Sequence, residues 1–220
     1  MEYRRETVRR KRHQPPVHSR KGYSMLSRTS YFVREHVGLM KLSDTYDILD
    51  PATQEQIGIA KEKPGTLFLL LRLAVNKRLL PTQVFVYEGV NHDDESRLLF
   101  SIRRGVSFFR SKVSICDRSG TVVGWLRSKA FSIGGAFRVF DAADNEVALV
   151  KGDWKGWNFR LLDKSENEMG TITKKWAGIG KELFTSADSY MIALNSESAP
   201  GKAILLLAAG LAVDVIFKEK

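Results

Sequence analysis

Cysteine is nearly absent from this chain of 220 residues, which contains a single one, Cys116. One cysteine excludes a disulfide framework within the chain and a zinc site built from several thiolates. It also suits a reducing compartment, so we expect a cytoplasmic protein. No apolar segment follows the N-terminal arginines, so we expect no secretory signal peptide, and Glu2 and Glu6 argue against an organellar transit peptide.

Long hydrophobic runs are scarce as well. The segment from Ala203 to Val213 is apolar on all sides of a helix, but Asp214 then interrupts it after eleven residues. A membrane-spanning helix needs roughly 20 apolar residues, so a buried core helix is favoured and no transmembrane span is expected. Ser198 suits the N-cap and Pro200 the first turn. The sequence therefore predicts a buried helix over residues 200–217.

Acidic residues are outnumbered, with 25 Asp and Glu against 35 Lys and Arg and a net charge of +10. Residues 1–21 hold +6 of this charge, so much of the basic character belongs to the N terminus. A basic segment suits an anionic partner such as lipid headgroups or nucleic acid, although a solvated tail without a partner explains it equally well. We expect residues 1–28 to form a disordered basic tail and residues 29–220 a single domain.

Motifs for catalysis and cofactor binding are missing too. Nucleophilic catalysis needs a nucleophile, a base and an orienting group. His13 and His18 lie in the predicted tail, and His36 and His92 stand in no local motif. We therefore expect neither a conventional enzyme nor a bound cofactor.

The sequence does contain many short segments rich in β-branched and aromatic residues, separated by Asp, Gly and Asn turns. A second apolar segment, Thr66 to Leu80, is bounded by Pro64 and Pro81 and predicts a helix outside the sheet. Twelve strands are predicted, at residues 31–35, 45–50, 56–62, 83–88, 97–103, 112–117, 121–127, 136–141, 146–152, 157–163, 168–175 and 189–194.

A weak internal repeat links several of these strands. The unit CDRSGTVVG contains Asp117 and Gly124, and LDKSENEMG contains Asp163 and Gly170, whereas FDAADNEVA has Asp141 but no Gly. An Asp that ends a strand can accept hydrogen bonds from turn amides, and a Gly tolerates a bulge at the start of the return strand. The spacing indicates consecutive hairpins.

Cations and aromatic residues alternate in two neighbouring hairpins and form the candidate binding site. Such a pattern suits the headgroup layer of a membrane or a nucleic-acid groove, and ordinary aromatic packing with solvated charges is the alternative. The candidates in the hairpins are Lys151, Trp154, Lys155, Trp157, Lys174 and Lys175, and those in the tail are Arg9, Arg10, Lys11 and Arg12.

The segment GTITKKWAGIGKELFTSADSYMIAL, residues 170–194, with the apolar helix after it, resembles the C-terminal part of phospholipid scramblases. Lys181 stands where the family usually has Arg, and Ser186 where it has Asp. The resemblance implies the tubby-like (LURP-one-related) fold, which is mainly β (α+β): a closed twelve-stranded antiparallel barrel around a central hydrophobic C-terminal helix. The matching positions are Gly170, Ile172, Lys175, Trp176, Gly178, Lys181, Glu182, Phe184, Thr185, Ala187 and Asp188.

The same segment departs from calcium-regulated scramblases, because Asp188 and Glu197 are its only acidic residues after the Phe-Thr pair. Calcium takes six to eight oxygen ligands, so calcium binding is not expected, and Asp188 is the one residue kept as a metal candidate. The resemblance implies a peripheral protein that binds anionic phospholipid, with lipid scrambling as the family activity. A nucleic-acid-binding, transcription-related tubby-like protein and a non-catalytic scaffold stay open as alternatives.

Overall fold

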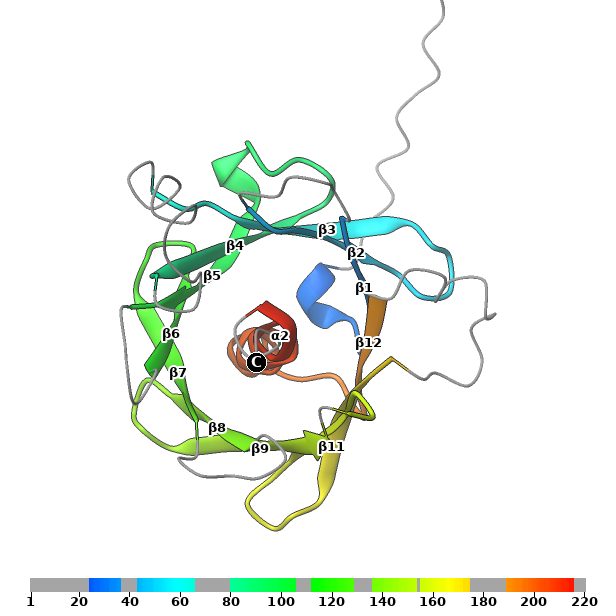
Figure 1. The fold of residues 1–220 in the computed structure, drawn as a ribbon, viewed down its shortest axis with the longest axis vertical. Helices are drawn as coiled ribbons and strands as arrows, with labels where there is room; N and C mark the ends of the chain where they lie inside the picture. Colours follow the sequence, from blue (N-terminus) through cyan, green and yellow to red (C-terminus); the bar gives the residue numbers. More distant parts are fainter. Residues whose placement is uncertain are drawn as a thin grey trace, which may run out of the picture.

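Twelve strands form a closed barrel in which each strand pairs antiparallel with its sequence neighbours, and β1 closes the ring against β12 (Figure 1). The computed structural model describes residues 24–36, 43–65, 80–105, 112–128, 136–153, 155–174 and 189–215. The strands are β1 (Ser30–Glu35), β2 (Thr45–Leu49), β3 (Gln56–Glu62), β4 (Thr82–Glu88), β5 (Leu98–Arg104), β6 (Lys112–Asp117), β7 (Val122–Ser128), β8 (Ala136–Asp141), β9 (Glu146–Asp153), β10 (Asn158–Leu162), β11 (Glu168–Thr173) and β12 (Ser189–Leu194).

The predicted closed antiparallel barrel of twelve strands is confirmed, and so is a helix near the C terminus. Most strand boundaries agree within a residue or two, because the alternation of buried and exposed positions defines the strand centres. The largest difference between a predicted and an observed strand end is at β11, which is predicted to reach residue 175 and ends at Thr173. The predicted outer helix lies outside the described residues, apart from Leu80.

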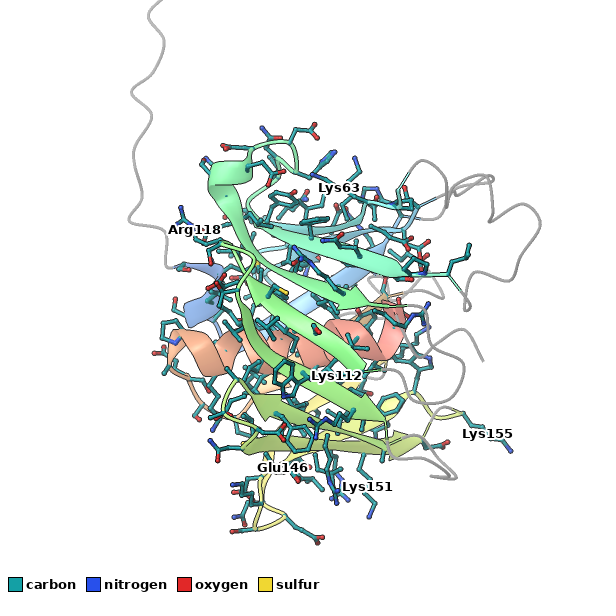
Figure 2. All side chains as sticks on the ribbon, turned by 90° about the vertical axis from the view of Figure 1, so that its left-hand side faces the viewer. Lys63, Lys112, Arg118, Glu146, Lys151 and Lys155 are labelled. Carbon is teal, nitrogen blue, oxygen red and sulfur yellow. The ribbon has the colours of Figure 1, made fainter. Side chains whose placement is uncertain are left out.

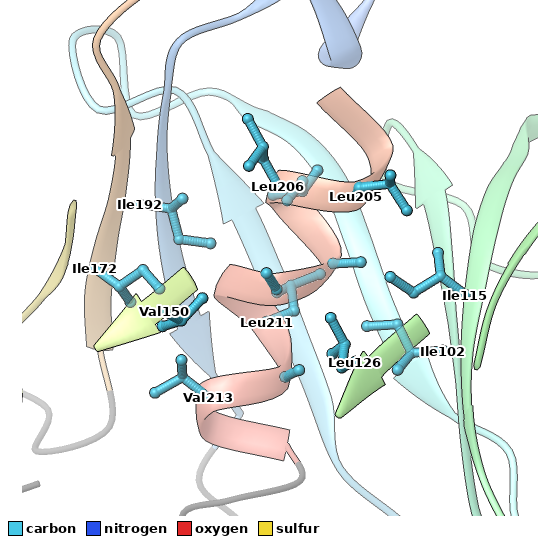
Figure 3. Close-up of a cluster of buried hydrophobic side chains, with 14 of the residues drawn as sticks. Ile102, Ile115, Leu126, Val150, Ile172, Ile192, Leu205, Leu206, Leu211 and Val213 are labelled. Carbon is cyan, nitrogen blue, oxygen red and sulfur yellow. The ribbon is translucent and has the colours of Figure 1, made fainter. Parts of the chain in front are cut away.

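The C-terminal helix α2 (Pro200–Val215) lies within the ring of strands in Figure 1. Its residues Leu206, Leu207 and Leu211 are at most 1% exposed. They belong to the same buried cluster as inward-facing residues of the wall, such as Ile115 and Ile172 (Figure 3). Helix and wall therefore share one hydrophobic core.

A short 3-10 helix, η1 (Met25–Ser27), packs against α2 inside the ring. The Met25 side chain is buried, and its backbone amide donates to Oε1 of Glu88 at 2.7 Å. The hydroxyl of Tyr31 donates to the carbonyl oxygen of Met25 at 3.0 Å. The predicted tail extends to residue 28, but Met25 belongs to the hydrophobic core. Residues 1–23 of the predicted tail lie outside the described residues.

The Asp-to-Gly repeat corresponds to hairpins with a β-bulge. The register shifts opposite Gly58, Gly124 and Gly170, and the hairpin that lacks the Gly has the same shift at Ala148. A Cβ on Gly170 would lie 2.4 Å from the carbonyl oxygen of Ala193 on the neighbouring strand. The glycines therefore let two backbones approach each other at these bulges.

Replacing Gly170 with Ala is expected to lower the free energy of unfolding by about 1–3 kcal/mol, because a paired backbone oxygen cannot move aside alone. Gly201→Ala is the matched control, since nothing lies within 4 Å of the added Cβ. Urea unfolding of both variants measures the difference. Equal midpoints for the two variants would contradict the close approach at Gly170.

The hairpin turns hold ionised carboxylates. Asp117, Asp141 and Asp163 each accept hydrogen bonds from backbone amides two and four residues further on. Hydrogen bonds from a Ser or Asn side chain and from these amides lower the pKa of all three carboxyls below 3.8.

A carboxyl with a lowered pKa in the folded state stabilises the fold above the unfolded value, and that stability is lost as the pH falls through the folded value. We therefore expect the free energy of unfolding to fall below about pH 4. Replacing Asp117, Asp141 and Asp163 with Asn should make this fall shallower. Urea midpoints at about pH 5 and about pH 3 measure it, and an unchanged pH dependence in the variant would contradict the role of the turns.

Candidate anion-binding surface

The two ends of the barrel carry opposite charge within the described residues. We call the end formed by the turns at residues 50–55, 93–95, 118–121, 142–145 and 163–167 the turn end, and the opposite end, where α2 finishes, the basic end. Figure 2 shows Arg118 of the turn end and Lys155 of the basic end on opposite sides. Carboxylates dominate the turn end: Asp50, Asp93, Asp94, Glu95, Asp117, Asp141, Asp144, Asp163 and Glu166. Cations outnumber carboxylates at the basic end: Arg34, Arg103, Arg104, Lys112, Arg138, Lys151, Lys155 and Lys174. The side chains of Lys63 and Arg127 instead reach carboxylates of the turn end, Glu95 at 3.2 Å and Asp144 at 2.8 Å.

Five exposed cations cross consecutive strands towards the basic end: Lys112 on β6, Arg127 on β7, Arg138 on β8, Lys151 on β9 and Arg160 on β10. Lys112 pairs with Arg127, and Arg127 pairs with Arg138. Lys151 pairs with Arg160 and stands two residues after the partner of Arg138. We call these residues the basic row. Lys112 and Lys151 mark it in Figure 2.

Like charges directly opposite one another on paired strands lower stability. The basic row therefore costs folding free energy, and an anionic ligand would relieve this repulsion. Two ion pairs within the chain offset part of this repulsion. Arg127 donates to Oδ1 of Asp144 at 2.8 Å, and Nε of Arg138 lies 3.3 Å from Oε2 of Glu146. Both ion pairs are exposed, so water and salt screen them. Lys151 and Arg160 have no ion pair among the described residues.

Two aromatic rings lie beneath cations of the basic row. The ammonium of Lys112 is 3.4 Å from the ring centre of Trp125, and the guanidinium of Arg127 is 4.7 Å from that of Phe140. The indole Nε1 of Trp125 donates to Asp144 at 3.1 Å, which fixes the ring. Cation–π contacts hold the two charges at defined positions on the outer wall.

The predicted hairpin between β9 and β10 lies at the basic end. Lys155 is exposed in the turn of this hairpin, and its backbone amide donates a hydrogen bond to the carboxylate of Asp153 at 2.9 Å. Trp157 has a positive φ of 48° and is half-buried, with its ring 5.2 Å from that of Tyr190. Lys174 places its ammonium 4.6 Å from the Trp157 ring centre. The Trp157 ring therefore packs against Tyr190 of the barrel interior and also contacts the ammonium of Lys174.

The interior of the basic end is polar. Asp214, near the end of α2, is 2% exposed, and burial, with the charge of Asp214, raises the pKa of Tyr190 well above its usual value. Burial and the charge of Asp214 also raise the pKa of Tyr46 well above its usual value. Both phenols therefore stay neutral at physiological pH.

The structure brings Lys151, Lys155, Trp157 and Lys174 to one end of the barrel, as a joint site requires. The remaining candidates Arg9, Arg10, Lys11, Arg12, Trp154, Lys175 and Asp188 lie outside the described residues. Sequence reasoning missed Arg127, Arg138 and Arg160. The available signal was one cation at an outward position in each of five successive strands.

Within the described part of the chain, no group of three or more His, Cys, Asp or Glu residues is placed to hold a metal ion. None of the helices in those ranges combines the length and apolarity needed to cross a bilayer.

The family model described as Scramblase aligns with residues 44–220, which is most of the chain. No curated protein matches the sequence, and no solved structure matches it either. The match includes every strand from β2 to β12, as well as α2.

Proposed function

Because this chain belongs to the scramblase family, we propose that it binds anionic phospholipid headgroups and that the basic end of the barrel faces the membrane. The observation that carries the proposal is the basic row, five exposed cations on five adjacent strands. Each Lys or Arg near an anionic bilayer contributes about 1 kcal/mol. A row of this size therefore supplies enough attraction for peripheral binding, and the carboxylates of the turn end orient the barrel by repulsion.

Anionic lipids are concentrated in the cytoplasmic leaflet, so we propose a peripheral protein of that leaflet. The Lys–Trp contacts of the β9–β10 hairpin support this placement, because Trp and Lys suit the headgroup layer. Binding needs no catalytic group and no cofactor. Lipid scrambling is the activity that the family name suggests, and headgroup binding would be its first step.

We also propose that α2 is the central filling of the barrel and stays there when the protein binds a membrane. The support is the burial of Leu206, Leu207 and Leu211 in one cluster with the wall. The membrane contact would then be made by the outer surface of the barrel, and α2 would contribute only through the hydrophobic core that it shares with the wall.

Vesicle co-sedimentation tests the proposal. The full chain and a variant lacking residues 1–22 are compared on phosphatidylserine-containing and on neutral vesicles, with duplex DNA as competitor. We expect both proteins to bind anionic vesicles and to resist displacement by DNA, with weaker binding by the shortened chain. Binding that DNA displaces would favour the nucleic-acid alternative, and equal binding to both kinds of vesicle would overturn the headgroup proposal.

A further inference from the structure

Two cations of the basic row face each other directly on neighbouring strands. Lys151 on β9 pairs with Arg160 on β10, and both side chains are exposed. Directly opposite residues of an antiparallel pair have Cβ atoms about 4.5–5.5 Å apart, so these two long side chains reach the same point above the outer wall. Figure 2 shows Lys151 projecting away from the barrel. The pair therefore presents two positive charges to one small area.

This pair differs from the rest of the basic row in its partners. Lys112 and Arg127 lie over aromatic rings, and Arg127 and Arg138 have carboxylate partners. In the part of the chain that the structure describes, Lys151 and Arg160 have neither a ring contact nor an ion pair. Like charges that face each other across two strands lower stability. Among the described residues of the row, the charge that lacks compensation is thus concentrated at this pair.

The positions on either side of the pair are small and neutral. Ala136 on β8 lies opposite Lys151. Thr171 on β11 lies opposite Arg160 and adds a neutral hydroxyl. The carboxylate two residues along β9, that of Asp153, accepts hydrogen bonds from two backbone amides of its own turn at 2.9 and 3.1 Å. The immediate neighbours on the adjoining strands therefore leave both cations accessible to an anion from solution.

A third cation stands at a diagonal position. Arg138 lies opposite Leu149, which precedes Lys151 by two residues on the same face of β9. Diagonal neighbours are about 7–8 Å apart, within reach of long side chains. Nε of Arg138 lies 3.3 Å from Glu146, so this arginine adds attraction at longer range. Lys151 and Arg160 are the direct binding groups.

We propose that Lys151 and Arg160 together bind a phosphomonoester group, presented by a lipid headgroup or by a free phosphate ester. Such a group carries a charge of about −1.5 to −2 at neutral pH and three acceptor oxygens, whereas a phosphodiester carries a single charge. Two converging cations therefore gain more from the monoester, through charge-assisted hydrogen bonds from the guanidinium fork and the ammonium. For the lipid source the inference rests on the proposed function, which brings the basic row to the membrane surface.

The test compares vesicles containing phosphatidic acid with vesicles containing phosphatidylserine, matched for surface potential. We expect about tenfold tighter binding of the unaltered protein to phosphatidic acid. Lys151→Gln/Arg160→Gln should bind both kinds of vesicle more weakly and without a preference. Both side chains are exposed and the change removes a like-charge contact, so the melting temperature should be unchanged or raised.

A matched control removes the same charge elsewhere in the basic row. Lys112 and Arg127 also pair across neighbouring strands, so Lys112→Gln/Arg127→Gln should weaken binding to both kinds of vesicle and keep the preference. Arg160→Lys retains the charge but loses the planar pair of donors, so it should keep phosphatidylserine binding and lower the preference severalfold. At about pH 5 the phosphomonoester holds a second proton, and the preference of the unaltered protein should shrink.

Calorimetric titration with glycerol 3-phosphate measures the free ester directly. We expect saturable binding by the unaltered protein and by Lys112→Gln/Arg127→Gln. Lys151→Gln/Arg160→Gln should show none.

The outcomes separate this inference from the proposed function. Equal binding of the unaltered protein to both kinds of vesicle, without glycerol 3-phosphate binding, overturns the phosphomonoester site and leaves general headgroup binding intact. Saturable glycerol 3-phosphate binding without vesicle binding supports the site, with a free ester as its ligand, and overturns the membrane proposal. A phosphatidic acid preference that survives Lys151→Gln/Arg160→Gln, or that disappears equally in Lys112→Gln/Arg127→Gln, overturns the assignment to this pair.

Discussion

Replacing Lys112, Arg138 and Lys151 together with Gln is expected to weaken binding to phosphatidylserine vesicles by about a hundredfold at low salt. The three residues belong to the basic row and are exposed. Each cation near an anionic bilayer contributes about 1 kcal/mol, and about 3 kcal/mol corresponds to roughly a hundredfold in the dissociation constant. Titration of vesicles into labelled protein measures the change.

The same variant should be at least as stable as the unaltered protein. Lys112 pairs with Arg127, and Arg127 with Arg138, so neutral side chains remove repulsion between strands. Loss of binding with an unchanged or raised urea midpoint would thus separate a surface effect from unfolding.

A control with the same change in charge is available at the turn end. Arg97, Arg118 and Lys164 are exposed there, and their replacement with Gln should leave vesicle binding within about a factor of two, because this end faces away from the membrane. If both triple variants lose binding equally, net charge alone governs it and the basic row has no special part.

The second large effect is expected from Leu207→Asp in α2. Leu207 is fully buried within the cluster shared by helix and wall. An ionised carboxylate there has no partner, and burial of an unpaired charge costs far more than the stability of an ordinary domain can offset. We expect this variant to be unfolded at 25 °C, whereas Leu207→Ala should lose about 2–5 kcal/mol.

Lys202→Asp places the same carboxylate at an exposed position near the start of the same helix, where the helix dipole favours a negative charge. It should fold normally. Circular dichroism with thermal melting compares the three variants. A folded Leu207→Asp protein with a melting temperature near that of the unaltered chain would contradict the placement of α2 in the barrel interior.

Much of the fold could be predicted because its determinants are local. An Asp such as Asp141 accepts hydrogen bonds from backbone amides of its own turn. Gly170 stands where the backbone of a neighbouring strand approaches closely. Both requirements lie within a few residues, so the sequence displays them. The twelve strands follow from the same alternation of turns and buried positions.

The binding surface could be predicted only in part, because it depends on pairing between strands. Arg138 stands alone in AFRVFD, and only the register places it beside Arg127 and near Lys151. Gln83 and Arg103 are likewise distant in sequence, and their pairing across β4 and β5 orients the guanidinium group of Arg103.

Trp157 illustrates the opposite difficulty. Its place between lysines suggests a residue exposed at the membrane, yet its ring packs at 5.9 Å from Phe159 and beside Tyr190. Sequence alone could not distinguish these roles, because both need a large amphipathic ring. The cation above the ring, Lys174, remains at the surface of the basic end.

The central claim is that the basic end meets the membrane, and fluorescence quenching by brominated phosphatidylserine vesicles tests it most directly. One probe is attached at Asn158→Cys, exposed at the basic end, and another at Ala142→Cys, exposed at the turn end. Cys116 is buried and is replaced with Ala to leave a single thiol. Strong quenching at position 158 and none at position 142 is the expected result. Stronger quenching at position 142, or binding without quenching at 158, would contradict the account.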